Sequence, residues 1–207
     1  MQYSQMVRKV GLSVLCVIGF GLMTGCAHDF VRPAPEAVKL GKSHSEDVIK
    51  AVSGSPFRHN NVVVNNEKID VISYLYTGNV SFWGAIIPQH MLTYSFYNDV
   101  LIGEELNSTF DGEKTEFDTG KVSQIRKGQT REQVIGILGT PSGRILYPLI
   151  TDKTGSGLVY AYAYSRFAPV VSPSWSYLLI ITFNENNVVT NISYKENNKE
   201  MIAQSGN

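Results

Sequence analysis

The chain has 207 residues, of which 43% are hydrophobic and 17% are charged, and its 18 basic residues equal its 18 acidic residues. This balance excludes nucleic acid as a partner, because proteins that bind it present an excess of positive charge. Of the two cysteines, Cys16 lies inside the hydrophobic N-terminal run, which leaves only Cys26 and excludes a fold held by disulfides.

Residues 1–25 are predicted to be a signal peptide. Arg8 and Lys9 form its positive region, and the apolar run that follows is too short to span a membrane comfortably. The run ends in Leu-Met-Thr-Gly before Cys26, which resembles a bacterial lipobox with Met23 where leucine is usual. The resemblance implies acyl chains such as palmitate on Cys26 and, because alanine follows it, sorting to the outer membrane. The alternative is an ordinary secretory signal with an incidental cysteine.

Residues 26–39 are predicted to be a lipidated tether. The run Arg-Pro-Ala-Pro at 32–35 favours an extended chain that packs on nothing. At roughly 3.1 Å per residue, the tether would reach about 40 Å and hold the folded part clear of the lipid headgroups.

A first module is predicted over residues 40–106, beginning with a short helix. Ser45 is expected to cap this helix, and Ile49 and Val52 form its apolar stripe. A Gly-x-Pro sequence at 54–56 ends it. Strands are expected at 68–77, 91–97 and 100–106, with Asn98-Asp99 as the turn of the closing hairpin.

Residues 107–122 are polar and acidic and are predicted to be a linker to a second module at 123–195. Thr130 is expected to N-cap the helix of this module, with Gln133 completing a capping box. The apolar stripe and the stop signal of the helix comprise Val134, Ile137, Leu138, Gly139 and Pro141. Strands are expected at 158–165, 177–183 and 188–194, followed by a polar tail at 196–207.

The two modules are predicted to be tandem copies of one unit. Aligned at their Gly-x-Pro ends, the helices lie 85 residues apart, which puts Ile49 in the place of Val134. A tyrosine pair recurs after 86 residues, beginning at Tyr74 and Tyr160. Because a helix of about two turns is not stable alone, each is expected to dock on a sheet. The predicted fold class is α+β: two modules, each with short helices on one face of an antiparallel sheet of about three strands.

The helix of the second module carries a motif that is similar to that of the SmpA/OmlA (BamE-like) lipoproteins. It comprises Lys127, Gly128, Thr130, Val134, Leu138, Gly139 and Pro141, after a lipobox and before a tyrosine-rich strand and a hairpin. The resemblance covers residues 40–195 and implies modules like the β-lactamase-inhibitor-protein fold. The best-known member is an accessory subunit of the outer-membrane β-barrel assembly machine. It has a single module, whereas two are predicted here.

The sequence contains no catalytic or metal-binding pattern, and no cofactor is expected. Glu104 and Glu105 alternate across a strand and so do not face each other. Carboxylates distant in sequence could still meet to cleave a sugar, which the sequence leaves open. The chain is therefore predicted not to be an enzyme. The histidines, which share no metal-ligand spacing, are His28, His44, His59 and His90.

Two apolar loops, one after each tyrosine-rich strand, are the candidate partner-binding sites. Loops usually lie at the surface, and exposed aromatic residues mark contacts with proteins or membranes. The alternative is that the loops fold back and cap the core. The tyrosine-bearing faces of the two strands likewise have two interpretations, as core beneath a helix or as an open face of the sheet that binds a partner. The candidate residues are Phe82, Trp83, Ile86, Ile87, Phe167 and Trp175.

These features predict a non-enzymatic outer-membrane lipoprotein on the periplasmic face that acts as a scaffold or assembly factor. Acyl chains on Cys26 would hold it at the membrane while the loops bind a protein partner, of which the β-barrel assembly machine is the leading candidate. The alternative is an inhibitor or envelope-binding module whose paired sheets cover an enzyme or peptidoglycan. A concave surface lined by Trp83 and Trp175 would favour that alternative.

Overall fold

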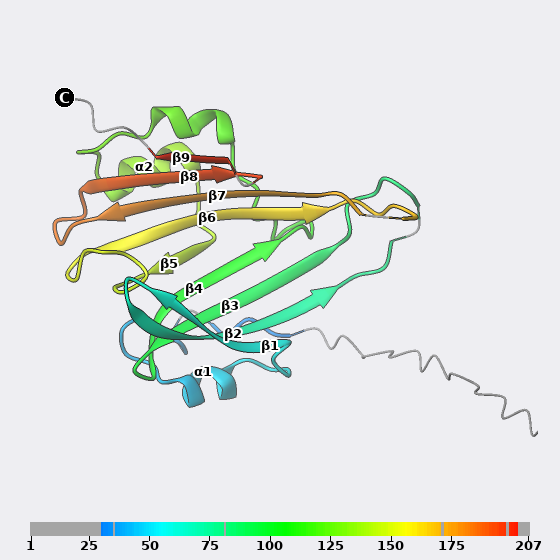
Figure 1. Ribbon diagram of the computed structural model, residues 1–207, viewed down its shortest axis with the longest axis horizontal. Helices are drawn as coiled ribbons and strands as arrows, with labels where there is room; N and C mark the ends of the chain where they lie inside the picture. Colours follow the sequence, from blue (N-terminus) through cyan, green and yellow to red (C-terminus); the bar gives the residue numbers. More distant parts are fainter. Residues whose placement is uncertain (1–29, 35, 81, 171, 198, 203–207) are drawn as a thin grey trace, which may run out of the picture.

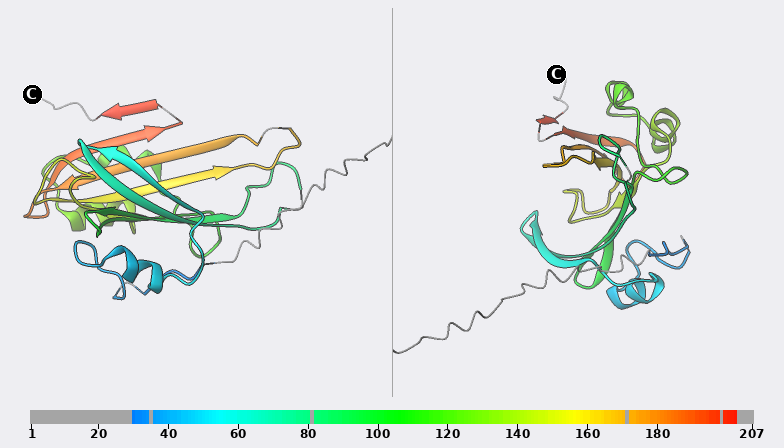
Figure 2. Two further views of the ribbon diagram at one scale, coloured as in Figure 1. Left: turned by 60° about the horizontal axis from the view of Figure 1, so that its bottom comes forward. Right: turned by 90° about the vertical axis from the view of Figure 1, so that its right-hand side faces the viewer.

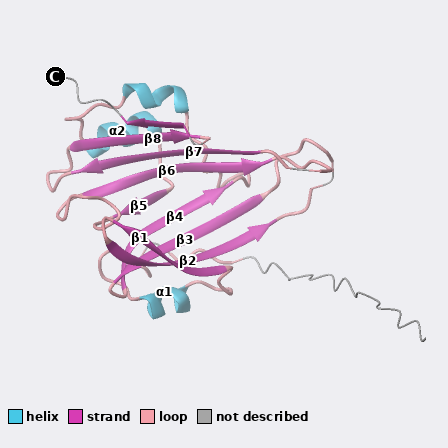
Figure 3. Ribbon diagram, in the orientation of Figure 1, coloured by secondary structure: helices cyan, strands magenta, loops and turns pink. Residues whose placement is uncertain are grey.

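The sheet dominates the fold. Nine strands of the described chain form one antiparallel sheet, in which each strand pairs with the next along the sequence (Figure 1). The sheet is strongly curved, and the helices lie against its convex side (Figure 2). The fold is thus mostly sheet with few, short helices (Figure 3). The computed structural model describes residues 30–34, 36–80, 82–170, 172–197 and 199–202.

The first half of the chain provides one helix and four strands. They are α1 (Ser45–Ala51), β1 (Arg58–Val64), β2 (Glu67–Thr77), β3 (Gln89–Tyr97) and β4 (Val100–Ser108). Asn98 and Asp99 have φ angles of 49° and 64° in the turn between β3 and β4, which confirms the predicted hairpin. β1 was not among the predicted strands; Asn65 and Asn66, with φ angles of 51° and 65°, make its turn to β2 in the same way.

The second half contains η1 (Thr119–Gln124), α2 (Arg131–Leu138), β5 (Gly143–Ile145), β6 (Ser156–Ser165), β7 (Ser174–Phe183), β8 (Val189–Glu196) and β9 (Lys199–Ile202). The predicted linker at 107–122 is corrected at both ends, because β4 continues to Ser108 and η1 begins at Thr119. The predicted tail at 196–207 is corrected over 199–202, where β9 pairs with the backbone groups that β8 would otherwise leave open at the sheet edge.

The start of α2 follows its sequence signals. Thr130 accepts a hydrogen bond from the Gln133 N–H at 3.3 Å, and its own N–H donates to the Gln133 side chain at 2.8 Å. This geometry confirms the predicted capping box. Val134 and Leu138 are buried, and Gly139 follows with a φ angle of 84°. The buried face, rather than helix propensity, stabilises so short a helix.

The helix α1 departs from its prediction by one residue. Its N-cap is His44 rather than Ser45, and its buried residues are Val48 and Val52, whereas Ile49 is 41% exposed. The two helices therefore correspond at an offset of 86 residues, the offset of the tyrosines, and not at 85. Packing against the sheet fixes the side chains that face the core, while the Gly-x-Pro loop after the helix can change in length.

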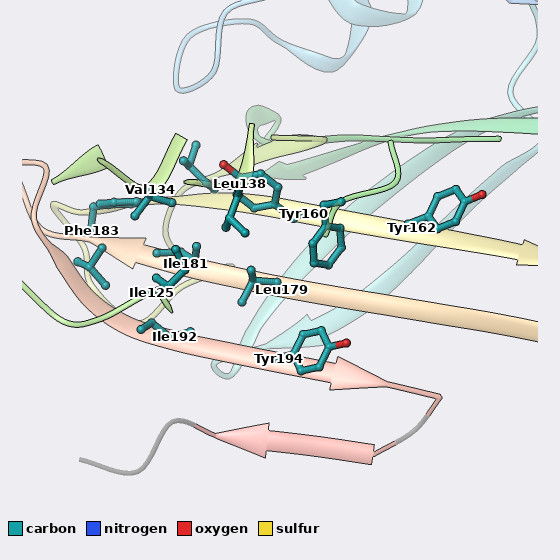
Figure 4. Close-up of a cluster of buried hydrophobic side chains, with 13 residues drawn as sticks. Ile125, Val134, Leu138, Tyr160, Tyr162, Leu179, Ile181, Phe183, Ile192 and Tyr194 are labelled. Carbon is teal, nitrogen blue, oxygen red and sulfur yellow. The ribbon is translucent and has the colours of Figure 1, made fainter. Parts of the chain in front are cut away.

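Each helix covers its own hydrophobic core on the convex side of the sheet. Beneath α2, Tyr160 and Tyr162 of β6 are buried with Val134 and with aliphatic residues of β7 and β8 (Figure 4). Beneath α1, Tyr74 of β2 is buried in the same way. Burial raises the pKa of the Tyr160 hydroxyl to about 12, and this hydroxyl donates to the Gly139 carbonyl at 2.9 Å. The tyrosine-bearing faces of β2 and β6 therefore belong to the two hydrophobic cores and are not open surfaces.

The expected pair of separate three-stranded sheets is corrected, because β5 joins the two halves into one sheet. β5 has only three residues and pairs with β4 on one side and with β6 on the other. Beyond β5, buried side chains continue the pairing with β6. The Asn107 amide donates to the Ala163 carbonyl at 2.9 Å and accepts from the Ala163 N–H at 2.6 Å. The Ser142 hydroxyl similarly donates to the Val159 carbonyl at 3.0 Å and accepts from the Ala161 N–H at 2.8 Å.

Replacing Asn107 by alanine is expected to lower the free energy of unfolding by about 2 kcal/mol, because two backbone groups of Ala163 lose their partners. Urea unfolding followed by circular dichroism measures the change. Asn191→Ala is the matched control, since Asn191 is exposed on β8 and the change should cost about 0.5 kcal/mol or less. Equal stability of the two variants would contradict the role given to Asn107.

The predicted tether at 26–39 is also corrected, because its second half packs on the fold. Phe30 and Val38 are 5% and 3% exposed and belong to the core beneath α1. The Val31 N–H donates to the Ser53 carbonyl at 3.1 Å. Burying an aromatic side chain contributes roughly 1.5–3 kcal/mol, which outweighs the preference of the neighbouring prolines for unpacked chain.

Candidate functional site

The two apolar loops that the sequence indicates meet at one end of the sheet. They connect β2 to β3 (residues 78–88) and β6 to β7 (residues 166–173), and both lie at the right-hand end in Figure 1. The Gly84 N–H donates to the Phe167 carbonyl at 2.9 Å, and the Phe167 N–H donates to the Ala85 carbonyl at 2.8 Å. The two loops therefore form one unit, which we call the loop tip.

The loop tip presents three large apolar side chains to solvent. Phe82 is 66% exposed, Trp83 is 71% exposed and Val170 is 91% exposed. The alternative in which the loops fold back over the core does not hold for Phe82 and Trp83. Val170 was not among the predicted site residues. The sequence indicates it only weakly: it is an apolar residue between two prolines, which disfavour a strand and so favour an exposed loop. Apolar side chains exposed together are typical of contact surfaces.

The other candidate residues of the loops support the tip from below. Ile86, Ile87 and Phe167 are partly buried. The Ile87 N–H donates to the Ser165 carbonyl at 2.9 Å, next to an antiparallel bridge between Ile86 and Arg166. These contacts continue the sheet pairing into the loops and limit their freedom to move apart.

Trp175 lies on a strand and not on the exposed part of the tip. Its ring stacks on Tyr164 at 5.1 Å with an interplanar angle of 14°, and Tyr164 packs against the core beneath α2. Trp175 therefore faces the convex side of the sheet. It does not line a concave surface with Trp83, the arrangement that would have favoured the inhibitor or envelope-binding alternative. The Arg166 guanidinium lies 6.0 Å from the Trp175 ring and donates to the Gly84 carbonyl at 2.9 Å, which links this ring to the tip.

An aromatic cluster at the same end of the sheet holds the N-terminal segment. The ring of His90, at the start of β3, lies 4.5 Å from that of Phe30, 5.2 Å from that of Phe110 and 5.4 Å from that of Tyr76. Cys26, the predicted lipid attachment residue, lies outside the described residues. Because Phe30 is only four positions later, a lipid on Cys26 would join the fold near the base of the loop tip.

The metal-ligating and acidic side chains of the described residues bear on the question of catalysis. They contain no group of three or more His, Cys, Asp or Glu side chains that could hold a metal ion. Glu104 and Glu105 lie on opposite faces of β4, as their alternation predicts, and Glu104 is paired with Arg144 at 2.8 Å.

Across the described chain, no helix has the length and apolarity needed to cross a bilayer.

A comparison with protein families bears on the second half of the chain. Residues 115–193 match the family described as outer membrane protein assembly factor BamE domain. Over these residues the chain is similar to a BamE domain, and we call residues 115–193 the BamE-like region. It contains η1, α2 and β5 to β8, and hence the second core and the loop at 166–173, but not the loop at 78–88. The loop tip is thus built jointly by the BamE-like region and the half of the chain before it.

Two further comparisons concern the whole chain. None of the curated proteins compared with it matches. Among solved structures, it is similar to a candidate β-lactamase inhibitor protein from Streptococcus mutans. The identity is 12% and the TM-score 0.37, with 74% of this chain and 82% of that chain covered.

Proposed function

We propose that this chain is a lipid-anchored protein on the periplasmic face of the outer membrane that acts as a non-enzymatic scaffold or assembly factor. The observation that carries the proposal is the composition of the loop tip. The loop at 166–173, which belongs to the BamE-like region, is hydrogen-bonded to the loop at 78–88, which exposes Phe82 and Trp83. The acyl chains on Cys26 confine the protein to the membrane, and the loop tip binds a protein partner.

The loop tip is suited to binding because it is held in shape before a partner arrives. The Gly78 N–H donates to the Pro88 carbonyl at 2.7 Å and closes the first loop at its base. The Thr109 hydroxyl accepts from the Gln89 N–H at 2.9 Å and donates to the Ile87 carbonyl at 3.1 Å. A preorganised surface loses less conformational entropy on binding, and exposed tryptophan is among the residues most often central to interfaces.

The partner we favour is the outer-membrane β-barrel assembly machine, as the family description suggests. We also propose that residues 40–106 and 123–195 are copies of one unit. Each has one helix followed by four strands in the described chain, and each places a fully buried tyrosine beneath its helix. On this proposal, the second copy lies in the BamE-like region and contributes the loop at 166–173. The first copy contributes the loop at 78–88.

Trp83→Ala is expected to weaken partner capture at least tenfold and to change the free energy of unfolding by about 0.5 kcal/mol or less, because the side chain is exposed. The measurement is affinity purification of the tagged lipoprotein from gently solubilised envelopes, with quantitative mass spectrometry and a thermal melt of each variant. Barrel-assembly subunits in stoichiometric amounts would support the proposed partner.

The matched control is Phe57→Ala, because Phe57 is 58% exposed but lies outside the loop tip. It should leave both capture and melting temperature unchanged. A large drop in the melting temperature of Trp83→Ala with unchanged capture would contradict the proposal. Recovery of a single periplasmic enzyme or cell-wall fragments would instead favour the inhibitor or envelope-binding alternative.

A further inference from the structure

The concave face of the sheet contains a pocket where the two halves of the chain meet. Its volume is about 260 Å³, and it lies over β3 to β7. Most of its walls are aliphatic side chains: Val64, Ile145, Leu149, Val159, Leu178 and Ile180. No lysine, arginine or histidine belongs to the described lining. The pocket lies on the face opposite the two helix-covered cores.

The walls of the pocket are fixed by contacts on both sides. The Asn65 side chain, in the turn that follows β1, donates to the Pro148 carbonyl at 2.8 Å. In the same region Glu67 accepts from the Tyr97 hydroxyl at 2.9 Å and from the Tyr147 hydroxyl at 3.4 Å. The β1–β2 hairpin and the connection between β5 and β6 are therefore tied together beside the pocket.

Glu105 places a carboxylate among these aliphatic side chains. It lies on β4 between Thr93 of β3 and Gly143 of β5, so the neighbour on the β5 side has no side chain. Within the described residues, the Glu105 side chain has no hydrogen bond and no ion pair. Glu104, the other titratable residue of the lining, turns its carboxylate to Arg144 on the convex face.

An unpaired carboxylate in this setting has an energetic cost. Burial raises the pKa of the Glu105 carboxyl, because the charged form loses hydration that nothing in the pocket replaces. The contribution of Glu105 to the free energy of unfolding is therefore most favourable at a pH below the pKa that its carboxyl has in the unfolded chain. The contribution is lost as the pH rises through the higher pKa of the folded state. At neutral pH, a cation bound beside Glu105 would offset that loss.

We propose that this pocket binds a lysine or arginine side chain that a partner protein presents. The methylene groups of such a side chain would contact the aliphatic walls, and its charged head would bind the Glu105 carboxylate. The charge is complementary, and the partly buried Leu178 and Ile180 of the lining suit the apolar neighbours of a basic residue in a polypeptide. This site is separate from the loop tip and does not depend on the lipid anchor.

The test compares two blocked tripeptides, acetyl-Leu-Arg-Leu-amide and the same peptide with citrulline in place of arginine. Citrulline keeps the shape of arginine without its charge. The full-length protein in detergent carries ¹³C at its glutamate carboxyl carbons, and the Glu105 signal is assigned by its loss in Glu105→Gln. We expect the arginine peptide to shift this signal and to bind at least tenfold more tightly than the citrulline peptide.

Two variants make the test decisive. Glu105→Gln should remove the preference for arginine, whereas Glu185→Gln, at an exposed turn, should keep it. Glu105→Gln should also melt at a higher temperature than the unaltered protein at pH 7 and match it at about pH 4, which shows that it is folded. Equal affinities for the two peptides, a preference that persists in Glu105→Gln, or no binding up to about 10 mM would each overturn the proposal.

Discussion

Replacing Val134 by aspartate is expected to unfold the half of the fold that α2 covers. Val134 is fully buried in the core beneath α2, where it meets Tyr160 and the aliphatic residues of β7 and β8 (Figure 4). A carboxylate there would lose its hydration without gaining a partner, which costs about 4 kcal/mol or more. Since most domains are stable by about 5–15 kcal/mol, this is a large fraction of the whole.

The neighbouring residue provides the control for this substitution. Ile135 lies on the same helix but is 37% exposed, so Ile135→Asp should cost about 1 kcal/mol or less. Urea unfolding of both variants, followed by circular dichroism and by tryptophan fluorescence, gives the two free energies. A loss for Val134→Asp no greater than that for Ile135→Asp would contradict the docking of α2 by this face.

Replacing Cys26 by alanine is expected to move nearly all of the protein from the outer-membrane fraction to the soluble periplasm. Each buried methylene of an acyl chain contributes about 0.8 kcal/mol to membrane binding, and more than one chain is needed for stable anchoring. We therefore propose that the acyl chains on Cys26 hold the protein at the membrane.

Fractionation with immunoblotting measures the Cys26→Ala effect, and Cys16→Ala is the matched control. Cys16 lies inside the predicted signal peptide, so its loss should leave the protein in the membrane fraction. Metabolic labelling with a palmitate analogue should mark the control and leave Cys26→Ala unlabelled. Continued outer-membrane fractionation of Cys26→Ala would refute the anchor.

Local sequence signals predicted the parts of the fold that depend on local interactions. The capping box at Thr130 and the turn at Asn98 were predictable because their hydrogen bonds join residues close in sequence. The register of α1 was not, because the Gly-x-Pro signal marks the end of a helix and does not report which side chains face the sheet. Only burial distinguishes Val48 from its neighbour Ile49.

The features that escaped prediction depend on residues distant in sequence. The three residues of β5 are too few to carry a strand pattern, yet they unite the sheet. The pairing of Asn107 with Ala163 spans 56 residues, and no local pattern announces it. The apolar character of both loops could be predicted from the sequence. Their contact with each other could not, because it depends on the two halves of the chain forming one continuous sheet. The lack of a partner for Glu105 is likewise visible only when its surroundings are assembled.

The packing of Phe30 changes how often the protein would meet a partner at the membrane. Only three residues separate Cys26 from Phe30, so the chain between them reaches about 14 Å instead of the 40 Å or so of a free tether. Because an acyl anchor on Cys26 would diffuse in the membrane plane, the shorter reach reduces only the height of the layer in which the folded part moves, by roughly threefold. The effective concentration of the loop tip near a membrane-bound partner rises by the same factor, without any new contact. A protein held this closely would favour partners whose binding surface lies just above the lipid headgroups.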